Sequence, residues 1–545
     1  MIRENLLHGQ AAGIQVPDDN RRFSILEAGG IKFNLKYLSS SFFALYGGIC
    51  ISVASTCFGN PTEDGGQSRG WWIFVTLGVV LSIIGFAVHA FLYGKMAFDK
   101  WKKWYTRRVS NERSAIIDQR WSDLAVRQTA PKTLHDYYKL MIITRDARRF
   151  FVKSVLKGVS HGSDTKIWLL IVKDLLLTSC EPATTKIELH AENDRELEHS
   201  FQLDVKTDID EFEKDILLAT CVESSRLYKM ETFLSKLKDY HPISADEFRN
   251  EVISVINLLT NADRFTYFFT CCDGNLKSYS CLYPAPVQPA YSGVILAQFA
   301  RQCAQTSAFV TTMPMMQMMN FMTMPNSFCY FGASNGREWV MNATKFKDQS
   351  IPESDLQLLD QTFEAISELF EEPEFQQFNW AGVGFQKHYS HLTITFESVK
   401  EQYVTAIKDK IRTILSSVNP TGDSFTIEET DVSFKISLRS ESRQIFHKGH
   451  GIDLFVEHVK CDLANGTILV CGDSLSDVEM LEVCLQANST GVFSIWVTTD
   501  STLHQKVLET CASYTNYKCV FVSCLDVLLS GMAQATIREI LIGRP

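Results

Sequence analysis

The chain has 545 residues, which is too long for one compact core, so the sequence predicts two or three domains in addition to its N-terminal segment. Its formal net charge of -10, without a long basic stripe beyond the N-terminal region, excludes a general nucleic-acid binder, because contacts to phosphate backbones need clustered Lys and Arg. The 15 cysteines show neither zinc-ligand spacing nor the pattern of a disulfide framework, which favours reduced thiols in the core.

Two apolar segments near the N-terminus, 37–58 and 71–93, contain no Asp, Glu, Lys or Arg. Each is long enough to cross the hydrocarbon layer as a helix, so the sequence predicts a transmembrane hairpin after a tail at 1–36. A pair of buried core helices is the alternative. Basic residues crowd the end of the second segment, whereas the connecting loop carries more acidic than basic residues. The positive-inside rule then predicts a multi-pass membrane protein whose two termini are both cytosolic.

Residues 94–261 begin with a basic stretch and continue with a helical pattern. The amphipathic stretches are Leu134–Leu156, Lys166–Leu177, Phe212–Leu237 and Ala245–Leu259. They predict an all-helical module, interrupted by a polar, acidic segment at 178–207 that is expected to form an exposed loop with short strands. The module shows no paired carboxylates and no glycine-rich loop, so its expected role is structural packing or contact with a protein partner.

Beyond Arg264 the pattern changes to short apolar runs that alternate with helical segments. The runs are 265–270, 308–312, 327–332, 467–471, 492–498 and 518–523, and the helical segments are 292–305, 477–486 and 501–513. This alternation predicts an α/β fold with a parallel sheet covered by helices on both faces. The core is predicted at 262–341 and 440–545, and 342–439 is predicted to be an inserted α/β cap.

Four polar segments lie at predicted strand ends or just before a helix, and phosphate-handling residues gather at the carboxyl ends of parallel strands. They are Cys271-Cys272-Asp273-Gly274-Asn275-Leu276, Thr311-Thr312-Met313-Pro314, His447-Lys448-Gly449-His450-Gly451 and Gly472-Asp473-Ser474-Leu475-Ser476-Asp477. The fourth is the most specific, because two carboxylates at the tip of a strand suit Mg2+, a hard cation that bridges to phosphate. Taken alone, it would equally fit an ordinary strand-to-helix turn with a helix cap.

In this order the four segments resemble the motifs of haloacid dehalogenase-type phosphatases, whose first motif normally reads Asp-x-Asp-Gly-Thr. The resemblance implies that the residue at position 271 attacks phosphorus and that Asp273 protonates the leaving oxygen. It also implies that Thr311 and Lys448 hold the phosphoryl group, the lysine by neutralising its oxygens. The implied ligands of Mg2+ are Asp273, Asp473 and Asp477.

A closer resemblance, from about residue 245 to the C-terminus, is to the trehalose-6-phosphate phosphatases, particularly those of nematode type. Phe331-Gly332-Ala333-Ser334-Asn335-Gly336-Arg337-Glu338-Trp339 is similar to the family stretch Gly-x-x-His-Gly-x-Glu, with Asn335 in place of the histidine. The resemblance implies that the cap helps to bind trehalose-6-phosphate or a related sugar phosphate. The expected substrate contacts are Asn335, Glu338 and Lys387. Further candidates are Gln386, His388 and His391. The alternative for these three residues and for Lys387 is that they are ordinary polar residues of a sheet edge.

Two departures from the family pattern bear on the chemistry. Cys271 stands where the nucleophilic aspartate belongs, and Asn275 stands where the family has threonine. A sulfur atom gives magnesium no hard oxygen ligand and cannot form an acyl-phosphate. Cysteine-dependent phosphatases need an arginine six residues after the thiol, and Lys277 stands at that position.

The sequence therefore predicts a membrane-anchored, trehalose-6-phosphate phosphatase-like protein of trehalose metabolism, with weak or no turnover and a weakened or lost Mg2+ site. Two alternatives stay open. One is an active magnesium-dependent phosphatase that hydrolyses trehalose-6-phosphate to trehalose and phosphate. The other is a membrane scaffold without a ligand.

Overall fold

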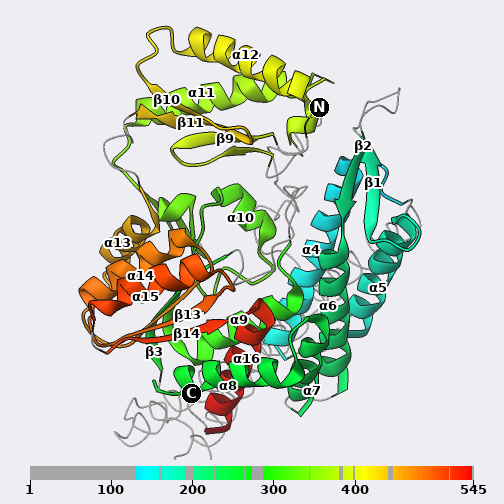
Figure 1. Ribbon diagram of the computed structural model, residues 1–545, viewed down its shortest axis with the longest axis vertical. Coiled ribbons are helices and arrows are strands. Elements are labelled where there is room, and N and C mark those ends of the chain that lie inside the picture. Colours follow the sequence, from blue (N-terminus) through cyan, green and yellow to red (C-terminus); the bar gives the residue numbers. More distant parts are fainter. Residues whose placement is uncertain are drawn as a thin grey trace, which may run out of the picture. The chain divides into compact units, whose positions relative to one another are not determined.

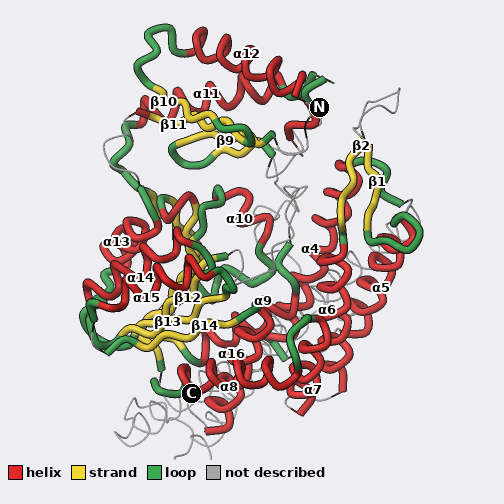
Figure 2. Tube along the Cα trace, in the orientation of Figure 1, coloured by secondary structure: helices red, strands yellow, loops and turns green. Residues whose placement is uncertain are grey.

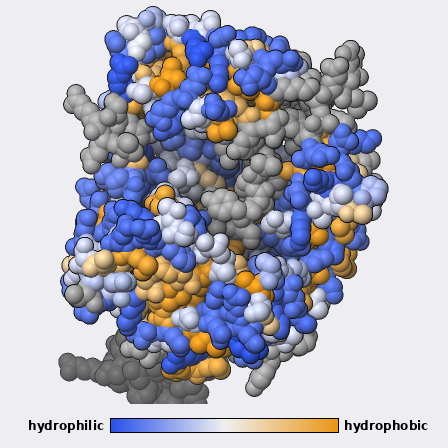
Figure 3. All heavy atoms as spheres, viewed as in Figure 1, coloured by the Kyte–Doolittle hydropathy of each residue, from blue (hydrophilic) through white to orange (hydrophobic). Residues whose placement is uncertain are grey.

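The computed structural model describes most of the chain beyond residue 129. The described residues are 130–158, 162–190, 200–224, 228–262, 264–272, 287–342, 344–372, 374–379, 384–396, 399, 401–439, 446–514 and 516–542. Hydrophilic residues cover much of the face seen in Figure 3, and hydrophobic residues gather on it in smaller groups.

The prediction of a transmembrane hairpin, and of a membrane location with both termini cytosolic, is contradicted. Among the described residues, no helix combines the length and the apolar composition that are needed to cross a bilayer. Even the apolar helix α16 (Leu525–Ile542) carries Asp526, Arg538 and Glu539, and it packs in the protein core. The segments predicted to span, 37–58 and 71–93, lie outside the described residues.

The predicted α/β core is confirmed by an eight-stranded sheet with the order β14-β13-β12-β3-β4-β5-β6-β7 (Figures 1 and 2). Its strands are β3 (Phe265–Cys271), β4 (Ala304–Val310), β5 (Tyr330–Ala333), β6 (Glu338–Met341), β7 (Thr344–Lys347), β12 (Ile468–Gly472), β13 (Val492–Val497) and β14 (Lys518–Val522). The strands from β14 to β5 pair in parallel, whereas β6 and β7 are antiparallel. Because β3 lies between β12 and β4, the segments that follow these three strands emerge next to one another.

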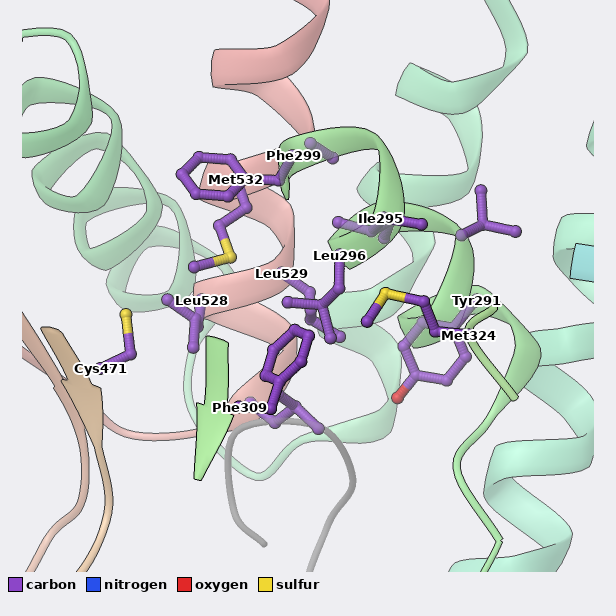
Figure 4. Close-up of a cluster of buried hydrophobic side chains, with 14 of the residues drawn as sticks. Tyr291, Ile295, Leu296, Phe299, Phe309, Met324, Cys471, Leu528, Leu529 and Met532 are labelled. Atoms are coloured by element: carbon purple, nitrogen blue, oxygen red, sulfur yellow. The ribbon is translucent and has the colours of Figure 1, made fainter. Parts of the chain in front are cut away.

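Side chains of the central strands alternate between two hydrophobic layers, as expected for a sheet buried on both faces. Phe268, Phe309 and Cys471 belong to one layer, and Phe269 and Val470 belong to the other. The helices of the first layer are α8 (Ala245–Leu259), α9 (Ala290–Gln302) and α16, and those of the second are α13 (Lys448–Val459), α14 (Leu475–Ala487) and α15 (Ser501–Ala512). Figure 4 shows part of the first layer, where residues of α9 and α16 surround Phe309.

A helical bundle precedes this core along the chain. Its helices are α4 (Leu134–Leu156), α5 (Gly162–Ser179), α6 (Lys206–Ser224) and α7 (Tyr228–Leu237). The segment expected to be an exposed loop with short strands holds an antiparallel pair, β1 (Lys186–His190) and β2 (Ser200–Asp204). The single helical stretch expected at 212–237 is divided between α6 and α7.

Two buried carboxylates join the bundle to the core. Asp526 of α16 accepts hydrogen bonds from Lys214 Nζ at 2.6 Å and from the Tyr291 hydroxyl at 2.9 Å, and it lies 2.7 Å from His241 Nε2. Asp215 of α6 accepts from Arg148 Nε at 2.6 Å and from the backbone N–H of Tyr291 at 2.9 Å. The backbone N–H of Tyr291 thus bonds α9 to Asp215 of the bundle. The Tyr291 hydroxyl bonds α9 to Asp526 of α16, which in turn pairs with Lys214 of the bundle.

The inserted segment between β7 and α13 forms an antiparallel four-stranded sheet with the order β10-β11-β9-β8. Its elements are α11 (Glu353–Leu369), β8 (Phe385–Lys387), β9 (His391–Thr395), α12 (Glu401–Val418), β10 (Phe425–Glu429) and β11 (Ser433–Leu438). Residues of both helices and of the sheet share one hydrophobic cluster. We call this segment the cap, and the exact division of the chain into domains stays a prediction.

Candidate functional site

Three of the four polar segments come together at the carboxyl ends of neighbouring strands. Cys271 is the last residue of β3, Thr311 follows β4, and Asp473 follows β12. The parallel register places Cys271 opposite Val310 on one side, and Thr270 opposite Cys471 on the other. The sheet alone therefore sets the positions of these residues.

Lys448 joins this group from the first turn of α13. Its Nζ atom donates hydrogen bonds to Asp477 Oδ1 at 2.6 Å and to Cys271 Sγ at 3.1 Å. The side chains of Lys448 and Asp477 are almost completely buried. A buried lysine needs such partners, because an unpaired charge away from water is costly. The site therefore has an ammonium group held between a carboxylate and a thiol.

Asp477 is fixed by the first turn of α14. Its Oδ2 atom accepts from the backbone N–H groups of Asp473 and Ser474, at 3.0 and 3.1 Å, and from the Ser474 hydroxyl at 2.9 Å. Ser474 and Asp477 form a capping box, in which the two side chains satisfy amides at the start of the helix. The Ser-x-x-Asp spacing in the sequence is the signal that predicts this arrangement.

Charge and burial set the protonation of the group. Burial, with the charge of Asp477 beside it, raises the pKa of the Cys271 thiol well above its ordinary value. Burial would raise the pKa of Asp477, but the charge of Lys448 and the hydrogen bonds that Asp477 accepts hold it below the ordinary value. Burial would lower the pKa of Lys448, but its carboxylate partner outweighs this effect and raises it well above the usual range. At neutral pH we therefore expect a protonated thiol beside a charged lysine and aspartate.

Cys271, Asp473 and Asp477 form the group that could hold a metal ion among the described residues. One donor atom of each lies within 4.8 Å of the others. Magnesium takes oxygen ligands in strict geometry, whereas a cysteine sulfur suits softer ions. Among the described residues, the donor set therefore fits Mg2+ poorly, because its two carboxylates are joined by a sulfur in place of a third oxygen ligand.

Thr311 and Asn335 lie together, but their described contacts are to the protein's own backbone. The Thr311 hydroxyl accepts from the N–H of Met313 at 3.2 Å, and the Thr311 carbonyl accepts from the N–H of Asn335 at 2.8 Å. Asn335 has a φ of 61°, in the left-handed region that asparagine tolerates better than most residues. A Cβ atom on Gly451 would lie 2.2 Å from the Asn335 carbonyl oxygen, so the first turn of α13 packs directly on this loop. Asn335 thus helps to seat the helix that begins at Lys448.

Glu338 and the cap meet at Ser334. The Ser334 hydroxyl donates to Glu338 Oε1 at 2.9 Å and accepts from the backbone N–H of Tyr389 at 3.1 Å. Burial raises the pKa of the Glu338 carboxyl. The sequence reasoning missed Ser334 and Tyr389, because nothing in the local pattern shows that a turn of the cap reaches this loop.

The other cap candidates divide between the core and the cap itself. Gln386 donates to Gln317 Oε1 of helix α10 (Met315–Phe321) at 2.6 Å, and His388 Nδ1 lies 3.0 Å from the Thr312 carbonyl oxygen. Both contacts lie next to the segment that contains Thr311. Lys387 instead forms an ion pair with Asp360 of α11, within the cap. Asp273 and Asn275 lie outside the described residues, so the structure says nothing of their positions.

Comparisons with known proteins identify the family. The family model described as trehalose-6-phosphate phosphatase, C-terminal, matches residues 268–528, and the model of the N-terminal helical bundle domain of the same enzyme matches residues 133–237. The trehalose-phosphatase of Caenorhabditis elegans is 25% identical over 429 residues, which cover 74% of this chain and 96% of that protein.

Longer relatives are more similar in sequence. Alpha,alpha-trehalose-phosphate synthase [UDP-forming] 2 of Aphelenchoides avenae is 51% identical over 441 residues, which cover 79% of this chain but 34% of the relative. The synthase 2 of Caenorhabditis elegans is 43% identical, and the match covers 79% of this chain and 36% of that protein. The chain thus spans about a third of the length of these synthases.

Among solved structures, the trehalose-6-phosphate phosphatase of Aspergillus fumigatus is similar over 52% of this chain and 97% of that chain, with 12% identity and a TM-score of 0.31. A score this low adds nothing to the assignment. The two family models, which match the helical bundle and the region from β3 to α16, carry it. The chain belongs to the trehalose-6-phosphate phosphatase family.

Proposed function

We propose that the protein is a trehalose-phosphatase-like component of trehalose metabolism that binds trehalose-6-phosphate and hydrolyses it weakly or not at all. One observation supports the loss of turnover. At the end of the central strand, where the family places an attacking carboxylate, the Cys271 sulfur lies 3.1 Å from Lys448 Nζ.

The thiol is poorly suited to replace the carboxylate. A nucleophilic cysteine reacts as a thiolate, and burial raises the pKa of Cys271 well above its ordinary value. Lys448 could favour a thiolate, but its charge is shared with Asp477, whose oxygen is nearer than the sulfur. The carboxylate also raises the pKa of Cys271. A neutral thiol at this position therefore attacks phosphorus poorly.

Recognition of the sugar phosphate rests on groups around the nucleophile position. Lys448 supplies the positive charge for the phosphoryl oxygens, and Thr311 supplies a hydroxyl at the end of β4. Glu338, which contacts Ser334 below the cap, is the proposed contact for a sugar hydroxyl. Asn335 and Lys387 stay weaker proposals, because Asn335 supports α13 and Lys387 pairs with Asp360.

Phosphate release from trehalose-6-phosphate tests this function. The purified full-length chain should release phosphate at the background rate. The double variant Cys271→Asp, Asn275→Thr restores the family's first motif and should raise the rate by at least about tenfold, because it returns an oxygen nucleophile to the site.

The matched control is Cys271→Asn with Asn275→Thr, which has nearly the same shape as the restored motif but no nucleophilic oxygen. It should stay at background. Robust release by the unaltered chain that Lys448→Met abolishes would contradict the proposal and establish an active phosphatase. Absence of trehalose-6-phosphate binding in calorimetry, in both the unaltered and the restored chain, would instead leave a scaffold.

A further inference from the structure

We propose that Lys448 is the cation of this site in place of a divalent metal, so that the site recognises a sugar phosphate without Mg2+. The identity of the sugar phosphate rests on the proposed function. The absence of a magnesium requirement rests on the geometry around Lys448.

The ammonium group of Lys448 contacts the atoms that a metal would need. Its Nζ atom lies 2.6 Å from Asp477 Oδ1 and 3.1 Å from Cys271 Sγ, which belong to two of the three candidate ligand residues. A magnesium ion would have to approach ligand oxygens to about 2.0–2.1 Å. A dication bound by these atoms would have to share them with the ammonium group of Lys448.

Two of the three candidate ligand residues offer a dication little. The sulfur of Cys271 is soft and gives Mg2+ little. Asp477 is occupied on both oxygens, because Oδ1 accepts from Lys448 and Oδ2 accepts from two backbone N–H groups and the Ser474 hydroxyl. These bonds also hold Asp477 in one orientation, set by the first turn of α14.

The charge of the group points the same way. Among the described residues of the group, Lys448 contributes one positive charge, and Asp473 and Asp477 contribute one negative charge each. An aspartate at position 271 would add a further negative charge that a dication could balance, whereas a thiol adds none. The cysteine therefore removes both an oxygen ligand and part of the electrostatic demand for a metal. Lys448 stays as the fixed positive charge beside the nucleophile position.

Metal binding is tested directly on the full-length chain with Mn2+, a paramagnetic stand-in for Mg2+. Titration followed by electron paramagnetic resonance should show one fewer bound Mn2+ in the unaltered chain than in Cys271→Asp. Equal binding in the two proteins would overturn the proposal. This measurement needs no substrate and no turnover.

Sugar-phosphate binding gives the second readout. In calorimetry, Kd for trehalose-6-phosphate should differ by less than about threefold between EDTA and millimolar Mg2+, and Lys448→Gln should weaken binding by at least about tenfold. The exposed Lys506→Gln on α15 is the matched control and should bind as the unaltered chain does. Asp473→Asn, which removes a negative charge, should strengthen binding in EDTA, whereas a metal site would lose affinity.

Binding that Mg2+ or Zn2+ strengthens about tenfold or more would overturn the proposal. Circular dichroism of Lys448→Gln shows whether that variant folds. If it does not fold, the binding of trehalose-6-phosphate by Asp473→Asn in EDTA tests the proposal instead. If no protein binds trehalose-6-phosphate, the proposed function fails, while the Mn2+ titration still decides whether the metal site is lost.

Discussion

Two buried lysine–aspartate pairs in this protein differ in the further hydrogen-bond partners that each pair has. Lys448 and Asp477 lie at the strand ends, and Lys214 and Asp526 lie between the bundle and the core. All four side chains are at most 4% exposed. Besides Lys214, Asp526 contacts the Tyr291 hydroxyl and His241, both strong hydrogen-bonding groups. Besides its bond to Asp477, Lys448 donates a hydrogen bond to the Cys271 sulfur, which is a weak acceptor.

The difference separates a structural charge cluster from one that can respond to a ligand. The partners of Asp526 come from α6, α9 and the turn before α8, so the cluster closes the junction between segments distant in sequence. At the strand ends, a phosphate oxygen would be a better acceptor for Lys448 than sulfur is. A ligand could therefore replace the sulfur contact without breaking the pair with Asp477. The predictions below test that contrast.

The largest effect is expected at the junction. Asp526→Ala leaves Lys214 buried without its carboxylate and should reduce the free energy of unfolding by about 3–5 kcal/mol, because an uncompensated buried charge is costly. Denaturation with urea measures this change. The exposed pair of Asp246 and Arg249 is the matched control, and Asp246→Ala should change the stability by less than about 1 kcal/mol. Equal losses in the two variants would remove the contrast between buried and exposed pairs.

A smaller loss is expected from Lys448→Met at the strand ends. Asp477 would lose one partner but would keep its three bonds within the first turn of α14, so we expect a loss of about 1–3 kcal/mol. The same denaturation series measures it. A loss as large as that of Asp526→Ala would mean that the pair at the strand ends is as structural as the one at the junction.

The stability should also fall at alkaline pH because of His241. Burial lowers its pKa, but hydrogen bonds to Asp526 and Cys524 outweigh burial and raise the pKa from 6.5 to about 9. A raised folded-state pKa gives stability that is fully present below the unfolded value and is lost as the pH rises through the folded value. After allowance for partial exposure, we expect a loss of about 1–2 kcal/mol as the pH rises from neutral to beyond the folded-state pKa. Unfolding curves across this range measure the loss, and His241→Gln should flatten it.

The smallest effect is expected where the cap meets the core through neutral side chains. The hydrogen bond from Gln386 to Gln317 joins two uncharged, half-buried groups. A double-mutant cycle with Gln386→Ala and Gln317→Ala should give a coupling energy of about 0.5–1.5 kcal/mol in unfolding experiments. A coupling near zero would show that this contact does not hold the cap on the core in solution.

The sequence predicted the core because its signals are local. Short apolar runs with polar residues at their ends indicated β3, β4 and β12, and a parallel sheet then brings Cys271, Thr311 and Asp473 together. Periodic patterns also indicated an inserted α/β cap, although no pattern was found that predicted helix α11. The identity of Cys271 could be read directly, and with it the doubt about catalysis.

Contacts between distant segments could not be predicted in this way. The sequence around Asp526 does not show that Lys214 and His241 contact its carboxylate. The sequence around Asn335 does not show that its carbonyl lies against Gly451. The transmembrane hairpin was predicted from hydropathy alone, and no helix of the described part of the chain has the character it requires. Lys387 was predicted to contact the substrate because it is a polar residue of the cap, whereas in the structure it forms an ion pair with Asp360.

The buried hydrogen bonds around Tyr291 have a practical consequence for truncation. A fragment that starts at Arg264 would keep Tyr291 and Asp526 but lose Lys214, Asp215 and His241. It would leave Asp526 of α16 without Lys214, and the Tyr291 amide of α9 without its acceptor. Helix α9 leads directly into β4 and Thr311. We therefore expect such a fragment to be disturbed at the strand that precedes Thr311, the proposed phosphate contact, and a poorly behaved fragment would say little about the intact chain.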